Sequence, residues 1–190
     1  SLPLIHHDMK NGNKEEQDSI WVLIYTKPKE EIKANNNLIN QGFQTFLPLI
    51  SPTNKINKKD ILVPVFPRYL FAKINLDQGN WTLINSTYGV SKVVMFSDKF
   101  TSIPVHIIQG IKSKLDQAGI YRQNISIEDY QKGDSVSIKE GRLAGIDAVF
   151  VSKKSKDRVR LLLKLLNTSI HAEVDKSNIG QKEVIDSFKF

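Results

Sequence analysis

The chain has 190 residues, of which 40% are hydrophobic, so it can form one medium domain or two small ones with a packed core. A total of 27 Lys and Arg against 20 Asp and Glu gives a net charge of +7, which suits a polyanionic partner. The absence of cysteine excludes disulfides, a thiolate nucleophile and cysteine-ligated metals. No run of about 18 apolar residues and no secretory signal layout occur, so we expect a cytoplasmic protein without a membrane span.

The first elements predicted are a strand and a helix that follow a polar arm. Residues 1–18 are mostly polar and predict a disordered arm. Residues 20–25 (IWVLIY) are apolar on both faces, which predicts a central strand. Pro28 suits the first position of a helix, which we expect to run to about Gln41 and to end at Gly42.

One face of this predicted helix is polar in an informative way. Its long and amide side chains recur at helical spacing: Lys29, Lys33, Asn36, Asn37 and Asn40. Such side chains suit phosphates and the edges of bases, although a solvated helix face has the same pattern. The face is therefore a candidate nucleic-acid site that composition alone does not establish.

The stretch VFPRYLFAKI, residues 65–74, predicts a strand with two different faces. Pro67 has no backbone N–H to donate to a β-ladder hydrogen bond, so strand pairing should start just after it. Because successive side chains of a strand point to opposite faces, Leu70, Ala72 and Ile74 should form a core face. Tyr69 and Phe71 should form an aromatic face on the other side. The aromatic face is either ordinary core or a docking surface for another protein.

The other elements of this half complete an α+β sandwich with a largely antiparallel sheet, a first domain over residues 19–118. We expect strands over 43–49 and 90–96, a basic hairpin tip over 51–60, and a short helix over 77–85 that carries Trp81. Pro104 should open a second long helix whose apolar stripe is Ile108, Ile111, Leu115 and Ala118.

The remaining residues predict a linker over 119–131, a small second domain over 132–180 and a tail over 181–190. Short alternating runs separated by glycine or charged turns favour a five-stranded barrel. A helical stripe also runs through the same domain, at Val159, Leu162, Leu163, Leu166 and Ile170, and upstream at Leu143, Ile146, Val149 and Phe150. The second domain is therefore either a barrel or a helical hairpin.

The order of three motifs resembles the NusG family of transcription elongation factors. They are FPRYLF (residues 66–71), WTLINSTYGV (81–90) and a KOW-type signature, GDSVSIKEGRLAG (133–145). INSTYGVS, LLLKLLN and Arg68 in place of the usual glycine after FP resemble the RfaH subfamily. The resemblance implies an amino-terminal domain of the NGN type and a carboxy-terminal KOW domain.

The resemblance also implies a transcription elongation or antitermination factor that suppresses pausing and termination by binding both pincers of bacterial RNA polymerase. The hydrophobic patch for the clamp helices, carried over by position, is Phe66, Tyr69, Phe71, Val93, Phe96, Ile108 and Ile111. The element for the opposite pincer is Asn80, Trp81, Thr82 and Leu83. Binding of this kind biases a conformational equilibrium and involves no chemistry.

A second implied partner is the non-template DNA strand. The matching positions are Lys27, Lys33, Asn37, Thr87 and Tyr88, of which Lys33 and Asn37 also lie on the polar helix face. An unstacked base would stack on Tyr88 and bond to Lys27 or Asn37. Pro28 and Tyr88 stand where RfaH has basic residues, and Asn37 where it has histidine, which implies a different or looser DNA target.

In RfaH-like proteins the carboxy-terminal domain is a helical hairpin when it covers the polymerase patch and a barrel when released. The barrel binds a small-subunit ribosomal protein and couples transcription to translation. Arg158 is present here, but Val63 replaces the acidic residue that it would meet across the interface. We therefore expect docking that is weaker or that rests on apolar contacts alone.

Two other classes of function remain to be weighed. A KOW-containing RNA-binding or ribosome-associated module would stack RNA bases on Tyr69 and Phe71. An enzyme is disfavoured, because no histidine has a nucleophile or metal partner nearby in the sequence and no glycine-rich phosphate loop occurs. We expect no catalytic residue, no cofactor and no metal, and a monomeric protein.

Overall fold

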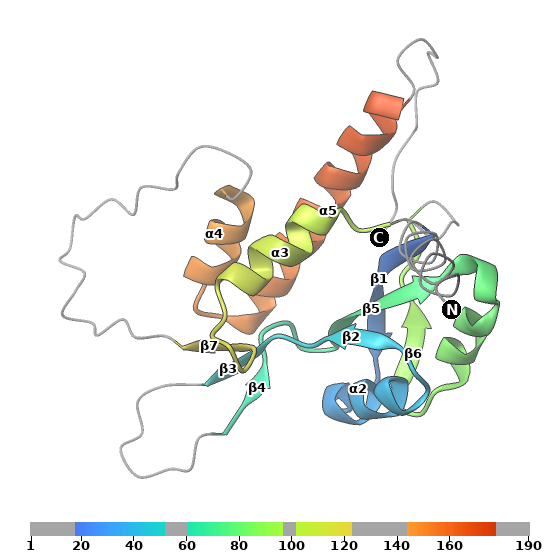
Figure 1. Ribbon diagram of the computed structural model, residues 1–190. Helices are drawn as coiled ribbons and strands as arrows, with labels where there is room; N and C mark the ends of the chain where they lie inside the picture. Colours follow the sequence, from blue (N-terminus) through green and yellow to red (C-terminus); the bar gives the residue numbers. More distant parts are fainter. Residues whose placement is uncertain (1–17, 52–60, 97–101, 123–143, 178–190) are drawn as a thin grey trace, which may run out of the picture.

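The computed structural model describes residues 18–51, 61–96, 102–122 and 144–177 (Figure 1). The predicted arm (up to residue 17), the tip of the basic hairpin, most of the linker and the tail lie outside these ranges. The KOW-type signature also lies outside them, apart from its last two residues.

A four-stranded antiparallel sheet forms the centre of the first domain. Its strand order is β2 (Gln44–Phe46), β5 (Tyr69–Asn75), β1 (Ser19–Thr26) and β6 (Val90–Val93). The predicted central strand and the strand after Pro67 are both confirmed and pair with each other. Their apolar residues on both faces place them in the middle of the sheet.

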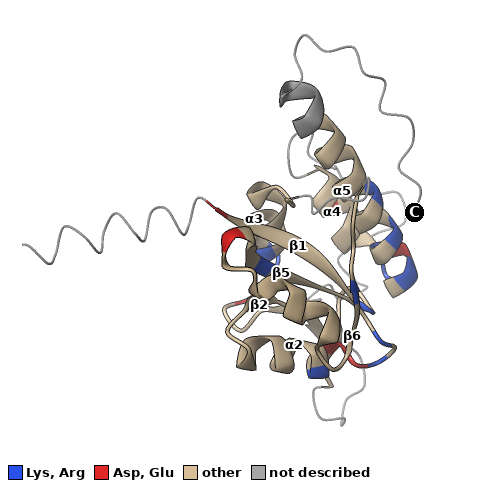
Figure 2. Ribbon diagram, turned by 90° about the vertical axis from the view of Figure 1, so that its right-hand side faces the viewer, with Lys and Arg blue, Asp and Glu red and all other residues tan. Residues whose placement is uncertain are grey.

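The two faces of β5 enter two separate cores, as the alternation predicts. Leu70, Ala72 and Ile74 pack beneath α2 (Glu31–Asn40) with apolar residues of β1 and β6. Phe71 enters the other core, which contains residues of α3 (Val105–Ser113), α4 (Ala144–Val151) and α5 (Ser155–Ser177). Helices therefore lie on both sides of the sheet (Figure 1, Figure 2).

The helix α2 begins later than the sequence predicts. Pro28 lies in a turn, and the helix begins at Glu31, with Glu30 at the N-cap position but without a side-chain capping hydrogen bond. Lys29 has a φ of 61°, a left-handed conformation that is incompatible with a right-handed α-helix. The predicted end is confirmed, because Gly42 follows the helix with a φ of 92°.

Three short strands form a second sheet, which the sequence analysis described incorrectly. The strand expected over 43–49 divides into β2 and β3 (Leu49–Ser51). β3 pairs antiparallel with β4 (Val63–Pro64), which confirms the hairpin, and parallel with β7 (Ile120–Arg122). β7 lies inside the predicted linker, which is therefore wrong at residues 120–122.

A turn centred on Asp116 explains why helix α3 ends early and a strand follows. The carboxylate accepts hydrogen bonds from the backbone N–H groups of Ala118 and Ile120 and from Nε of Arg122. The helix thus ends at Ser113, and two members of the predicted stripe, Leu115 and Ala118, lie beyond it. In the connection from β5 to β6, the expected short helix is two 3₁₀ helices, η1 (Leu76–Gln78) and η2 (Asn80–Ser86).

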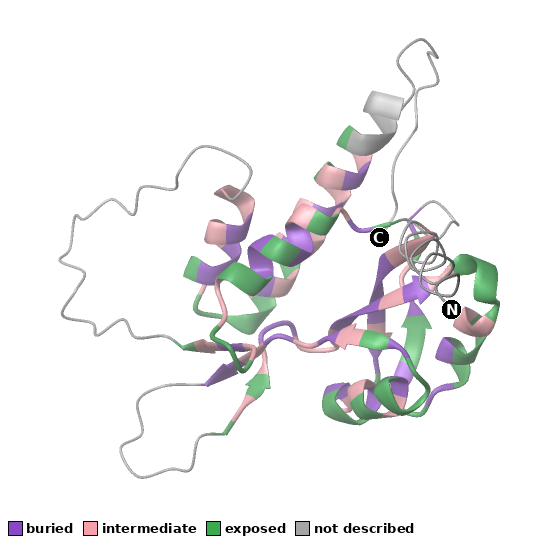
Figure 3. Ribbon diagram, in the orientation of Figure 1, coloured by how far each residue is buried: buried purple, intermediate pink, exposed green. Residues whose placement is uncertain are grey.

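The described part of the second domain is a helical hairpin of α4 and α5. Of the predicted helical stripe, Ile146, Val149 and Phe150 in α4 and Leu162, Leu166 and Ile170 in α5 are buried (Figure 3). Gly145 allows the two helices to lie close, because a Cβ there would come within 2.6 Å of Leu165 Cδ1. Of the two predicted alternatives, residues 144–177 adopt the helical one.

Gly89 fixes the distance between α2 and the turn before β6. Its φ is 92°, and a Cβ at this position would lie 2.8 Å from the backbone nitrogen of Ala34. Backbone atoms of a helix cannot move aside as a side chain can.

We expect Gly89→Ala to lower the free energy of unfolding by about 2–5 kcal/mol, through backbone strain and overpacking together. Urea denaturation followed by circular dichroism measures the change. Gly42→Ala is the control, because Gly42 has the same φ of 92° but no atom within 4 Å of the added Cβ. It should lose only about 1–2 kcal/mol. Equal losses in the two variants would contradict the close-approach explanation.

Candidate nucleic-acid and protein interfaces

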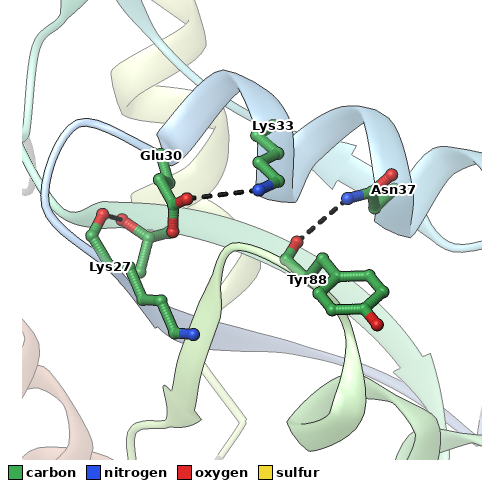
Figure 4. Close-up of polar contacts among 6 residues, drawn as sticks. Lys27, Glu30, Lys33, Asn37 and Tyr88 are labelled. Carbon is green, nitrogen blue, oxygen red and sulfur yellow. Dashed lines mark hydrogen bonds and ion pairs between the residues drawn. The ribbon is translucent and has the colours of Figure 1, made fainter.

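The first candidate interface lies where α2 faces the turn between η2 and β6 (Figure 4). Asn37 Nδ2 donates a hydrogen bond of 3.0 Å to the carbonyl oxygen of Tyr88. Gln41 Nε2 donates one of 2.9 Å to Oγ1 of Thr87. These contacts join residues 46 and 51 positions apart and hold the turn against the helix.

Lys27 is brought to the same place by the backbone. Its N–H donates to the carbonyl oxygen of Gly89 at 2.9 Å, next to Tyr88 in the chain. The side chain of Lys27 is exposed. A lysine at the end of β1 and a tyrosine before β6 thus become neighbours.

The group combines an exposed ring, cations and an amide. Tyr88 is 77% exposed, and Nζ of Lys33 lies 6.0 Å from its ring centroid. Lys33 also contacts Glu30 at 3.3 Å, an exposed pair that contributes little to stability. Exposed aromatic rings with adjacent cations are the parts from which single-strand binding surfaces are built.

Four of the five predicted DNA-binding residues meet here with exposed or half-exposed side chains, and Thr87 has a different role. Thr87 is buried, donates its hydroxyl to the carbonyl oxygen of Leu83, and accepts from Gln41. It fixes the turn that presents Tyr88. The sequence analysis missed Gln41 and the close approach of Gly89 to Ala34, since neither leaves a local signal.

The second candidate interface is the aromatic face of the sheet. Five of the seven predicted patch residues are buried in one cluster: Phe66, Phe71, Phe96, Ile108 and Ile111. Tyr69 is half-buried against them, and burial, followed by the neighbouring Tyr25, raises its pKa, which Arg68 opposes. Val93 is not brought together with the others, because it lies in the core on the opposite face.

The helical hairpin covers this aromatic face. The ring of Phe150 meets Phe66 edge-on at 6.4 Å and lies 4.8 Å from the ring of Tyr121. Lys114, just after α3, forms an ion pair with Asp147 of α4. If the hairpin were released, these apolar side chains would form an exposed patch, and exposed apolar patches are candidate protein-binding sites.

Arg158 adds a polar contact to the hairpin interface. It is 4% exposed, and its Nε donates a hydrogen bond of 3.0 Å to the carbonyl oxygen of Val65. Its other contacts, at 3.2 and 3.0 Å from Nη1, are the carbonyl oxygens of Ser152 and Lys153 in the loop between α4 and α5. Burial lowers the pKa of Arg158, which the neighbouring Tyr121 opposes.

Of the two expected alternatives, docking through apolar contacts alone is therefore wrong, and weaker docking stays a prediction. Although Val63 is not acidic, the same segment supplies the carbonyl group of Val65. Within the described residues Arg158 has no carboxylate partner, and carbonyl dipoles take the place of the missing ion pair.

The predicted element for the opposite pincer forms the start of η2. Trp81 packs partly on the core beneath α2, and Thr82 and Leu83 are exposed. The helix thus anchors one large side chain and presents two smaller ones to solvent.

The described residues contain neither a cluster of metal-ligating side chains nor a membrane-spanning helix. No group of three or more His, Asp or Glu side chains there could hold a metal ion. None of the described helices combines the length and apolar character needed to cross a membrane.

Comparison with known proteins identifies the family of the first domain. Residues 19–112 match the family model described as transcription termination factor nusG. This part of the chain belongs to the NusG family. It contains the whole four-stranded sheet and both candidate interfaces apart from the hairpin.

A NusG-family relative covers more of the chain. The transcription termination/antitermination protein NusG of Halalkalibacterium halodurans is 23% identical over 135 residues, which is 65% of this chain and 76% of that protein. Among solved structures, "Domain interaction in Thermotoga maritima NusG" matches with a TM-score of 0.35 and 15% identity. That match covers 50% of this chain and 56% of the other, so the chain spans just over half of that structure.

We expect Phe150→Ala to loosen the hairpin from the NusG-family domain, because it removes the ring contacts to Phe66 and Tyr121. Such truncations cost about 3–5 kcal/mol. Hydrogen–deuterium exchange should accelerate in α4 and α5 and stay unchanged in β1 and β5. Val151→Ala is the matched control, because Val151 is 54% exposed and follows directly in the same helix. Unchanged exchange in Phe150→Ala would contradict the docked arrangement.

Proposed function

We propose that this NusG-family protein is a transcription elongation and antitermination factor that binds bacterial RNA polymerase through the aromatic face of its sheet. The observation that supports the proposal best is that this face is closed by the chain's own hairpin. Phe66 and Phe71 are fully buried. Helix α3 and the hairpin share in covering them, and the hairpin comes from residues beyond the family match. A family domain with a removable cover implies a partner that competes for the same surface.

The docked hairpin would then be a closed state that resembles the RfaH subfamily. Polymerase would bind only the molecules in which the hairpin is released. The apparent affinity of the chain for polymerase is therefore the intrinsic affinity multiplied by the released fraction. The contact of Arg158 with Val65 and the ion pair of Lys114 with Asp147 contribute to the closed state. The start of η2, with Thr82 and Leu83 exposed, would meet the opposite pincer.

Release would expose the apolar faces of α4 and α5 to water, which is unfavourable. Residues 158–165 also alternate basic and apolar side chains, except at Leu162, so the released segment can form strands of a KOW-type barrel. In that form it would bind a small-subunit ribosomal protein and couple transcription to translation.

The non-template DNA strand is the second proposed partner. Lys27, Lys33, Asn37 and Tyr88 form a compact group of cations, an amide and a ring that suits one unstacked base and its phosphates. The alternative, a KOW-containing RNA-binding or ribosome-associated module, has less support. It would leave the NusG-family domain, residues 19–112, without a role.

The polymerase proposal is tested with purified bacterial RNA polymerase and the full chain. Phe150→Ala should bind at least about tenfold more tightly than the unaltered chain, because a larger fraction of molecules is open. Adding Tyr69→Ala in this background should reverse the gain, and Val151→Ala should change nothing. Biolayer interferometry measures all four proteins. Equal affinity of the unaltered chain and Phe150→Ala would show that the covered face is not the polymerase site.

The DNA proposal is tested by fluorescence anisotropy with a labelled single-stranded oligodeoxynucleotide. Tyr88→Ala should weaken binding about tenfold, within the range of about 1–3 kcal/mol for one stacked base. Tyr88→Phe is the control, because it keeps the ring and should bind almost normally. If Tyr88→Ala binds as well as the unaltered chain, base stacking at this position is excluded.

A further inference from the structure

A second group of cations and rings lies beside the first, at the same end of the sheet. The guanidinium carbon of Arg68 lies 4.1 Å from the ring centroid of Tyr25, which is stacking distance. Nζ of Lys92 lies 5.9 Å from the same centroid, and Lys92 pairs with Tyr25 across the β1–β6 ladder. One tyrosine ring therefore positions two cations from two different elements.

The backbone holds Arg68 in an unusual conformation. Its φ of 71° is left-handed, which costs about 1–2 kcal/mol for a residue other than glycine. Its N–H donates at 2.9 Å to the carboxylate of the buried Glu31, and its carbonyl oxygen accepts from the N–H of Thr26 at 2.8 Å. Strain that the surroundings maintain in this way is typical of functional positions.

The side chain of Arg68 is fixed but not fully used. Nε donates to the carbonyl oxygen of Thr26 at 3.1 Å. Within the described residues, its two terminal nitrogens have no hydrogen bond or ion pair. The guanidinium is thus held through Nε and through stacking on Tyr25, and the N–H groups of its two terminal nitrogens stay available for a phosphate.

The two groups meet at the end of β1. Thr26, which Arg68 contacts through both its backbone and its side chain, precedes Lys27 of the first group. Figure 2 shows the basic segments in the loop that leads to α2 and beside β6, on one edge of the domain. Of the two carboxylates nearby, Glu31 is buried beneath Arg68 and Glu30 contacts Lys33.

We propose that Arg68 and Lys92, held by the ring of Tyr25, form a phosphate clamp for the sugar-phosphate backbone of the same nucleic-acid strand whose base stacks on Tyr88. The clamp extends the site across the end of β1, so the strand is held at one base and at a neighbouring phosphate. This inference rests on the proposed DNA binding. It adds residues outside that predicted site and identifies the chemical group that they bind.

Arg68→Gly tests the clamp without disturbing the fold, because glycine adopts a φ of 71° more readily than arginine. The full chain and a labelled single-stranded oligodeoxynucleotide are used in anisotropy titrations at several salt concentrations. Losing one phosphate contact should weaken binding about fivefold at about 0.1 M salt and reduce the slope of log K against log salt by about 0.7. Lys92→Ala, an exposed substitution, should have a similar effect.

Arg122→Ala is the control for loss of one positive charge, because Arg122 is an arginine of β7 in the other sheet. It should leave both affinity and slope almost unchanged. If Tyr88→Ala weakens binding but Arg68→Gly and Lys92→Ala do not, the clamp is wrong and the DNA site stands. If the unaltered chain binds no single strand, both are wrong. Equal binding and equal losses with a poly-glutamate peptide would also overturn the clamp, because they indicate a general anion patch.

Discussion

The fold depends on one strand, β5, whose two faces must both leave water. The face with Leu70, Ala72 and Ile74 is closed by α2, an element of the same domain. The face with Phe71 is closed largely by α3 and by the hairpin of α4 and α5. The hydrophobic effect is non-directional, so the apolar surface of a partner protein could bury this second face as well as the hairpin does. That exchange is what makes a buried strand a candidate binding site.

The sequence predicts the sheet well because its signal is local and repeated. The continuous apolar residues of β1 and the apolar run that opens β5 are each readable within eight residues. β4 and β7 have two and three residues, too few for any period to show. The start of α2 was predicted too early, because Pro28 gives a strong signal while the left-handed φ of Lys29 leaves none.

The state of the second domain could not be predicted from local pattern, since the segment around Arg158 satisfies both a period of 2 and a helical period. The decision comes from contacts far away in the chain. Phe150 reaches Phe66, and Arg158 bonds to Val65, 93 residues earlier. The same holds for the proposed DNA site. Helical spacing predicts that Lys33 and Asn37 share one face, but only the resemblance predicts that Tyr88 lies beside them. Arg68 stands where the resembling sequences usually have glycine after the FP pair, and its left-handed φ explains why glycine suits that position.

The two candidate interfaces respond differently to the hairpin. In the docked form Phe71 has no exposed surface, while Tyr88 is 77% exposed, so docking closes the proposed protein-binding face and leaves the proposed nucleic-acid face open. A chain of this kind can contact a DNA strand before its hairpin is released. Because Val65 accepts the bond from Arg158 only three residues before Arg68, one short segment carries contacts of both interfaces. Binding at Arg68 can change the docking equilibrium only if it alters this segment differently in the open and closed states.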